Sequence, residues 1–417
     1  MDVEQTLMEL VNPVFNTGKM TIYQLATTGN KDAKSICEKL DLTFEDTQNS
    51  SNTKTSADQQ KISTIMMEAR FRTTYAMAEK SGCKTLVDLP CGYTPRGIQC
   101  AEKGISYVGL DLPATIYELE PIVRSLLSPE KAGLVKYAGV DATNYSSLEK
   151  ALENVSGEIC ITTEGLLMYF SDYEVGELCD NIRKLLAKHG GCWITADPET
   201  TLQYVMTAKL IYGDQFEKIM LNSKQHVKDK SDVEIGQAQI LVKPGKDIAE
   251  NMKRSMSFLA AHGLKAERLT VADYMPELSF LKDEPELAAA YKQTMTKCSY
   301  WKITPIDGAQ DDSKNSGNEF GVKTSMSGDT LEMALTGRVD TLTAPEILSA
   351  FEKLAAQEPI KSVSVDCSRL DYISSAGLRV LLLMQKKCSG GVALSGTNEL
   401  VTDILQQTGF YNIFSIK

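Results

Sequence analysis

The chain has 417 residues, a length that favours two domains over a single hydrophobic core. Its 42% hydrophobic and 24% charged residues are the composition of an ordinary soluble globular protein. A formal net charge of −11 argues against nucleic acid or an anionic membrane as a partner. No apolar run is long enough for a transmembrane helix, and the acidic start Met-Asp-Val-Glu does not resemble a signal peptide. We therefore expect a cytoplasmic protein.

The cysteines and histidines argue against disulfides and against a metal site. The ten cysteines are scattered and form no Cys-x-x-Cys pair, a pattern typical of reduced and mostly buried thiols. The three histidines have no second histidine or cysteine at metal-ligand spacing; they are His189, His226 and His262. No metal is expected.

Residues 1–306 are predicted to form the first domain. After a helical pattern over 61–80, short apolar runs alternate with helical stretches; the runs are Thr85–Leu89, Ser106–Asp111, Gly133–Gly139, Glu158–Thr163 and Gly191–Ala196. Strands that alternate with helices predict an α/β fold with a doubly wound, mostly parallel sheet. A largely helical insertion is expected over 199–245, and then two further helices and two further strands. Residues 307–318 are predicted to be a flexible linker, and residues 319–417 a smaller second domain.

Acidic residues follow four successive predicted strands of the first domain. Asp88 and Asp111 are 23 positions apart, close to the spacing in nucleotide-binding units, where the first loop cradles the cofactor and the second acid binds ribose. Asp141 and Glu164 follow the next two strands. Any one of these acids alone would be read as a surface residue beside a tight turn. Four of them at the carboxyl ends of parallel strands predict one crevice, where ligands bind in such sheets.

The loop after the first strand limits which cofactor can bind there. It reads Asp-Leu-Pro-Cys-Gly-Tyr-Thr-Pro-Arg-Gly from Asp88 and lacks a Gly-x-Gly-x-x-Gly pattern, because Pro90 and Cys91 occupy the early positions. A dinucleotide pyrophosphate needs close backbone approach at glycines. The loop therefore favours a cofactor without pyrophosphate, such as S-adenosylmethionine.

Three motifs of the first domain resemble the leucine carboxyl methyltransferase family, which includes bacterial O-methyltransferases associated with polyketide pathways. They are Val-Asp-Leu-x-x-Gly-x-Thr-x-Arg, Gly-Leu-Asp-Leu-Pro and Thr-Glu-Gly-Leu-Leu-Met-Tyr-Phe. The resemblance covers roughly residues 1–304. It implies a Rossmann-like methyltransferase domain that binds S-adenosylmethionine and methylates an oxygen of a small molecule or of a protein carboxylate.

The resemblance also implies roles for individual residues near the cofactor. Asp111 would bind the ribose, Asp141 would contact the adenine, and Glu164 would lie beside the cofactor. Gly92, in the loop that follows Asp88, would line its methionine end. Where family members usually carry Gly-Ala, this chain has Pro90-Cys91.

An upstream arginine would pair with the carboxylate of the cofactor. In the run Glu-Ala-Arg-Phe-Arg-Thr, Arg72 is preferred and Arg70 is the alternative, and either could instead be a cation on a helix surface. A carboxylate acceptor would need no general base and a hydroxyl acceptor would need one, so the catalytic residues stay unknown. A second hypothesis is that the domain senses the cofactor without turnover.

The second domain carries a different signature. Its first strands have inward-facing Leu331, Met333 and Leu335, and Ser362–Asp366 reads as a buried strand that a short turn joins to a helix beginning at a serine pair. The stretches Leu-Thr-Gly-Arg-Val-Asp and Asp-Tyr-Ile-Ser-Ser-Ala-Gly-Leu-Arg-Val-Leu resemble the STAS domain of anti-sigma-factor antagonists over residues 319–417.

This second resemblance implies a regulatory phosphorylation. The serine at the helix start would be Ser375, the substrate of a partner kinase that is also the anti-sigma factor. Ser374 stands where many members have aspartate. The plainer reading is that both serines only cap the helix. A further alternative is that the domain mediates homodimerisation.

Overall fold

The computed structural model describes residues 15–43, 56–219, 238–243, 245, 247–306 and 319–417. Two compact units are formed, a larger one with Asn16–Asp311 and a smaller one with Asp312–Lys417. The division between them falls within 307–318, outside the described residues. The domain limits 1–306, 307–318 and 319–417 therefore stay a prediction.

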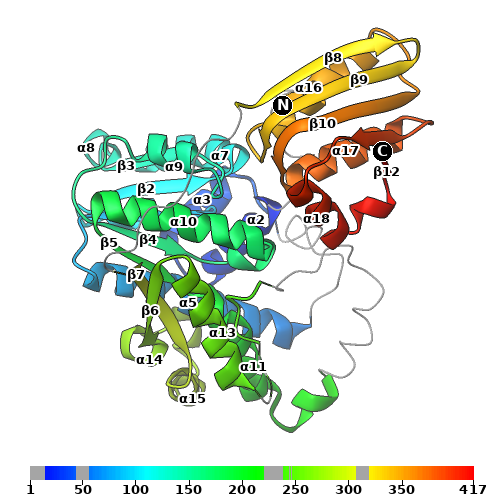
Figure 1. Cartoon of the computed structure of the whole chain (residues 1–417). Helices are drawn as coiled ribbons and strands as arrows, with labels where there is room; N and C mark the ends of the chain where they lie inside the picture. The colour runs from blue at the N-terminus through cyan, green and yellow to red at the C-terminus, as the bar shows by residue number, and fades with distance from the viewer. Residues whose placement is uncertain (1–14, 44–55, 220–237, 244, 246, 307–318) are drawn as a thin grey trace. The chain divides into compact units, whose positions relative to one another are not determined.

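The larger unit contains a seven-stranded sheet in the order β3-β2-β1-β4-β5-β7-β6 (Figure 1). The first five strands run parallel, whereas β7 is antiparallel to both of its neighbours. The strands are β1 (Thr85–Asp88), β2 (Ser106–Asp111), β3 (Val135–Gly139), β4 (Ile159–Thr163), β5 (Gly191–Thr195), β6 (Leu264–Thr270) and β7 (Ser299–Pro305). This confirms the predicted doubly wound, mostly parallel sheet.

Helices cover both faces of this sheet because neighbouring strand residues point to opposite sides. Leu86 joins the core on one side and Val87 the core on the other. The first side is covered by α2 (Phe15–Thr27), α3 (Lys31–Lys39), α5 (Ala57–Lys80), α6 (Arg96–Glu102), α7 (Pro113–Leu126), α14 (Val271–Tyr274) and α15 (Pro285–Met295). The second side is covered by α9 (Tyr145–Ala151), α10 (Asp172–His189) and α13 (Ile248–Ala261). Both faces are thus buried, as a mainly parallel sheet requires.

The region after β5 is helical over 197–219, whereas the described residues 238–243 form turns and irregular structure. Helix α11 (Thr200–Tyr212) packs on α5 and α15. The rest of the expected insertion lies largely outside the described residues, which omit 220–237. Helices α13 and α15 and strands β6 and β7 confirm the two helices and two strands expected after it.

The smaller unit has a five-stranded sheet in the order β12-β11-β10-β9-β8. Its strands are β8 (Gly321–Ser327), β9 (Thr330–Val339), β10 (Ser362–Ile373), β11 (Val392–Ser395) and β12 (Ser415–Ile416), and its helices are α16 (Ala344–Ala355), α17 (Ser375–Lys387) and α18 (Glu399–Gln407). Leu331, Met333 and Leu335 are buried in its core as predicted. This core includes side chains from all three helices and from the sheet.

Strand β10 is longer than the sequence predicts. The expected end at Asp366 is wrong, because pairing with β9 continues to Ile373. The register shifts between Asp366 and Arg369, and the Asp366 carboxylate accepts a hydrogen bond of 2.9 Å from the Ser368 backbone N–H. A polar bulge therefore takes the place of the expected turn, and the strand leads directly into α17.

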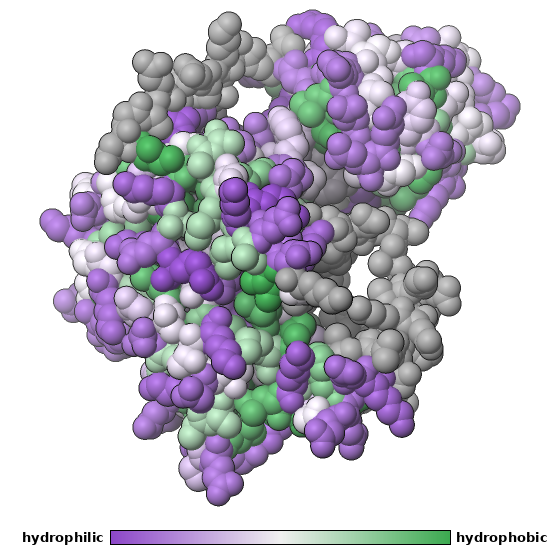
Figure 2. Space-filling view, turned by 60° about the horizontal axis from the view of Figure 1, so that its bottom comes forward, coloured by the Kyte–Doolittle hydropathy of each residue, from purple (hydrophilic) through white to green (hydrophobic). Residues whose placement is uncertain are grey.

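The visible surface mixes hydrophilic and apolar residues, and hydrophilic side chains form most of its outline (Figure 2). Exposed large apolar side chains are scattered among the described residues, namely Tyr117, Tyr204, Ile306, Tyr411 and Ile413. Within the described ranges, every helix is too short or too polar to cross a bilayer. All ten cysteines are unpaired and all except Cys83 are buried, which confirms the expected free thiols.

Candidate functional site

The carboxyl ends of four parallel strands lie side by side in the larger unit. The register pairs Asp88 with Gly109 and with Thr162, and pairs Asp111 with Gly139. The backbone N–H of Val140 extends this edge by donating to the Asp111 carbonyl at 2.8 Å. The four acids predicted from the sequence therefore follow adjacent strands along one edge of the sheet.

Asp88 and Glu164 are bridged by one buried arginine. Arg96, the first residue of α6, donates to both carboxylate oxygens of Asp88 at 2.9 and 3.0 Å and to Glu164 at 2.6 Å. Tyr107 and Thr162 also donate to Asp88. Burial raises the pKa of Asp88, while the positive charge of Arg96 lowers it. The two acids are held in one ion-pair cluster that is almost closed to solvent.

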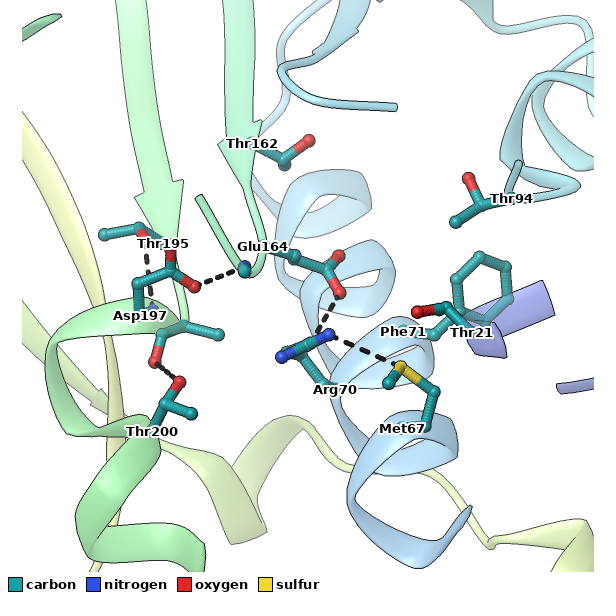
Figure 3. A network of polar contacts seen from close by, with 12 residues as sticks. Thr21, Met67, Arg70, Phe71, Thr94, Thr162, Glu164, Thr195, Asp197 and Thr200 are labelled. Atoms are coloured by element: carbon teal, nitrogen blue, oxygen red, sulfur yellow. Dashed lines mark hydrogen bonds and ion pairs between the residues drawn. The ribbon is translucent and has the colours of Figure 1, made fainter. Parts of the chain in front are cut away.

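Arg70, and not Arg72, reaches this cluster. Figure 3 shows the Arg70 guanidinium pointing to the Glu164 carboxylate, with Nε 3.4 Å from Oε2. Arg72 instead pairs with Glu68 at 3.0 Å and donates to Ser279. Both residues lie on α5, but two positions along a helix turn their side chains to different faces. The arginine that would hold a cofactor carboxylate stays a prediction, and the geometry favours Arg70 over the preferred Arg72.

Asp111 is linked to the loop that follows β1. Its carboxylate accepts hydrogen bonds from the backbone N–H groups of Gly92 and Leu112, each at 2.7 Å. Burial raises the pKa of Asp111 to about 6, although both amide hydrogen bonds lower it. Gly92 has a φ of 51° and open space where a Cβ would stand. The loop therefore leaves room for a ligand to approach the backbone beside Asp111.

Asp141 is engaged within its own turn. Its carboxylate accepts hydrogen bonds from the Thr143 backbone N–H at 2.8 Å and from the Thr143 hydroxyl at 2.6 Å. The residue is buried and follows β3 on the same edge as Asp111. The structure thus places Asp141 in line with the other three acids along the sheet, with its carboxylate turned to its own loop.

Asp197 is a site residue that sequence reasoning missed. Its carboxylate accepts hydrogen bonds from the backbone N–H groups of Gly165, Leu166 and Leu167 at 2.6, 2.8 and 2.9 Å. The acid thereby holds the turn that presents Glu164 (Figure 3). Asp197 follows the fifth parallel strand, so the rule that selected the first four acids would also have selected it.

Arg96 was also missed, although it lies within the first of the three motifs. The sequence shows an arginine at the start of a helix, and nothing in the pattern indicates that its side chain turns inward. Its burial depends on the acids of β1 and of the loop after β4, which only the folded sheet brings together.

The two serines of the smaller unit have different environments. Ser374 is buried and caps α17, accepting a hydrogen bond from the Gly377 backbone N–H at 3.4 Å. Ser375 is the first helical residue and is exposed. Capping therefore accounts for Ser374, while the Ser375 hydroxyl is open to solvent.

Comparisons with known proteins separate the two units. The family model "Mlab, STAS domain" matches residues 322–415. A candidate anti-sigma factor antagonist from Bordetella bronchiseptica is 37% identical over 87 residues, which are 20% of this chain and 72% of that protein. The structure of an anti-sigma factor antagonist from Mycobacterium paratuberculosis covers 24% of this chain and 85% of its own, at 19% identity and a TM-score of 0.22.

The larger unit is similar to methyltransferases at the level of the fold. The structure of an O-methyltransferase family protein from Burkholderia thailandensis covers 70% of this chain and 72% of its own, at 11% identity and a TM-score of 0.34. The smaller unit is matched in sequence, both by the family model and by the relative from Bordetella bronchiseptica. Through its residues 322–415, the chain belongs to the STAS domain family.

Proposed function

We propose that the chain is an S-adenosylmethionine-dependent O-methyltransferase fused to a STAS domain that is switched by phosphorylation of Ser375. The observation that carries the enzymatic part is the contact between Asp111 and the Gly92 backbone, in a loop with open space beside it. A carboxylate at the end of β2 is suited to accept hydrogen bonds from ribose hydroxyls. The open loop next to it is suited to the remainder of the same cofactor.

The proposal also assigns roles to Asp141, Glu164 and Arg70. Asp141 would contact the adenine, Glu164 would lie beside the methionine end, and Arg70 would pair with the cofactor carboxylate. Arg70 fits this role because 18% of its side chain remains accessible while its Nε faces Glu164. When bound, the cofactor supplies an electrophilic methyl group for an acceptor oxygen. The residues of the protein would align that acceptor and exclude water.

Calorimetric titration of the full chain with S-adenosylmethionine tests this proposal. Saturable binding that Asp111→Asn or Glu164→Ala weakens is expected, because each substitution removes one carboxylate from the strand-end group. Absence of binding to the wild type would contradict it. Production of S-adenosylhomocysteine with candidate carboxylate and hydroxyl acceptors then tests turnover.

A second candidate function is cofactor sensing without turnover. The hydrogen bonds that the strand-end acids already make favour this function. Arg96 donates to Asp88 and Glu164, and Thr143 donates to Asp141. Acids held in this way are poorly placed to act as the general base that a hydroxyl acceptor needs. Cofactor binding with no methyl transfer to either acceptor class would support this alternative.

The regulatory part of the proposal concerns the exposed Ser375. A phosphate there would add about −1.5 to −2 charge units at a helix N-terminus, where the helix dipole tolerates it. The charge would then act on a binding partner more than on the fold. The proposed partner is an anti-sigma factor that is also a serine kinase, as the similarity of this unit to anti-sigma factor antagonists suggests.

A further inference from the structure

Arg96 contacts several parts of the candidate cofactor site, and the proposed function assigns it no role. Besides Asp88 and Glu164, its guanidinium donates to the Phe71 carbonyl of α5 at 2.9 Å and lies 4.7 Å from the centre of the Phe71 ring. Only 3% of its side chain is accessible. A single group thus joins the end of β1, the turn after β4, the helix α5 and its own helix α6.

The planar shape of arginine suits this position. A guanidinium presents several N–H donors in one rigid plane, whereas a lysine ammonium is a single point charge. In this site one terminal nitrogen faces both oxygens of Asp88, and the other is shared between Glu164 and the Phe71 carbonyl. The arrangement therefore uses the geometry of arginine as well as its charge.

The two carboxylates beside Arg96 require a positive charge between them. Asp88 and Glu164 follow neighbouring strands, so both carboxylates face one small and mostly buried space. Two carboxylates that share such a space cannot both stay ionised without a compensating positive charge. Arg70 reaches only the Glu164 side, at 3.4 Å, while Tyr107 and Thr162 give Asp88 neutral donors.

We infer that Arg96 is a positioning residue of the candidate cofactor site, which holds the Glu164 carboxylate in place by clamping it to Asp88. This inference rests on the proposed function, since it concerns the same candidate cofactor site. Arg96 acts through Glu164 and is not assigned a contact with the cofactor. Asp197 holds the backbone of the same turn through three N–H groups, so the side chain and the backbone at Glu164 are held separately.

Titration of the Asp88 carboxyl group tests the clamp without any ligand. Full-length protein with labelled aspartate is followed by carboxyl-carbon NMR, and Asp88→Asn identifies the Asp88 signal by its loss. In Arg96→Gln, the midpoint should move up by about one to three pH units, because an opposite charge at hydrogen-bonding distance lowers a carboxyl pKa by that amount. The titratable groups facing Asp88 are Arg96, Glu164, Tyr107, Cys91, Cys100 and Tyr137.

Two further variants separate the charge of Arg96 from its geometry and its contribution to stability. Arg96→Lys keeps the charge, so the Asp88 midpoint should stay close to that of the wild type. Its S-adenosylmethionine affinity should still fall, by about 10- to 100-fold, as expected when a hydrogen bond to a charged group is lost. The matched control is Glu199→Gln, which breaks another arginine–carboxylate pair, between the buried Glu199 and the partly exposed Arg268, and should change neither quantity.

The outcomes distinguish this inference from the proposed function. A wild-type chain that does not bind S-adenosylmethionine would overturn the proposed function, while the Asp88 titration would still test the clamp. An Arg96→Gln variant with the wild-type Asp88 midpoint and wild-type affinity, but lower thermal stability, would overturn the clamp. If that variant does not fold, an Arg96→Lys variant with unchanged affinity would overturn it equally.

Discussion

At the scale of single residues, the environment of each carboxylate decides what it can do. Asp88 and Glu164 both pair with Arg96, whereas Asp111 accepts hydrogen bonds from backbone amides. Burial raises the pKa of Asp111 to about 6, because these hydrogen bonds do not fully replace the water it loses. The charge of Asp111 therefore changes near pH 6, in a range where the chain can be studied.

This raised pKa predicts pH-dependent cofactor binding. Ribose hydroxyls would donate hydrogen bonds to the carboxylate, so the ionised form of Asp111 should bind and the protonated form should not. Protonation begins as the pH falls through about 6, and the affinity falls with it. At about pH 5 the affinity for S-adenosylmethionine should be about tenfold lower than at about pH 7.5. Calorimetry at both pH values measures this ratio.

The control for this prediction is Asp111→Asn, which cannot ionise. Its affinity should be lower throughout and should lose the transition near pH 6 that burial of Asp111 predicts for the wild type. The same transition in the variant would assign the pH dependence to another group.

A second prediction at the scale of single residues concerns partner binding at Ser375. Ser375→Asp should weaken binding to the proposed anti-sigma factor, because it places a charge on an exposed position at the start of α17. The melting temperature should hardly change, since an acid in the first turn of a helix is favourable. Binding is measured by calorimetry or by co-elution with the partner.

Ser374→Ala is the matched variant for this experiment. It removes the cap from the same helix, so it should lower stability by about 0.5–2 kcal/mol without adding charge. Equal partner binding by the wild type and Ser375→Asp would contradict the switch.

At the scale of elements, helix α17 depends on close contact with the sheet of the smaller unit. A Cβ at Gly377 would stand 2.6 Å from a Val339 methyl carbon and 2.7 Å from Ile373 Cγ1. Both neighbours are buried in the core on β9 and β10. The helix that carries Ser374 and Ser375 can approach those strands only because position 377 has no side chain.

We therefore expect Gly377→Ala to destabilise the smaller unit. Overpacking of this kind typically costs about 1–3 kcal/mol, which exceeds the gain of about 1 kcal/mol from the better helix propensity of alanine. Chemical denaturation measures the difference. Gly245→Ala is the control, because a Cβ at that position would have no neighbouring atom within 4 Å. Equal stability of Gly377→Ala and the wild type would show that α17 can move away from the sheet.

At the scale of the whole molecule, the two units have separate hydrophobic cores. Among the described residues, two clusters fill the two faces of the larger sheet, and a third, built from Phe320 and later residues, fills the smaller unit. A ligand or a substitution in one unit can then change the stability of that unit alone. This separation fits a chain that combines the proposed cofactor-binding unit with a STAS unit.

The separation predicts two thermal transitions in calorimetry of the full chain. S-adenosylmethionine at about 100 times its dissociation constant should stabilise the larger unit by about 2.7 kcal/mol and shift only its transition. Gly377→Ala should shift only the other. A single transition that both changes move together would instead indicate that the units unfold as one.

The sequence by itself determined where most elements of both units lie, because hydrophobic periodicity is a local pattern. It also indicated the acids of the candidate site, because each of them directly follows a predicted strand. It located β1 to β5, the start of β10, the buried residues of β9 in the smaller unit, and the four acids that share one edge. It placed the end of β10 at Asp366, because a bulge and a turn have the same polar composition there.

Tertiary structure decided which side chains meet. The inward turn of Arg96, the choice of Arg70 over Arg72 beside Glu164, and the support from Asp197 all depend on strands and helices that are far apart in the chain. The burial of Ser374 and the exposure of Ser375 follow from how α17 packs on β9 and β10. Such contacts arise from packing between distant segments, which a local sequence pattern does not encode.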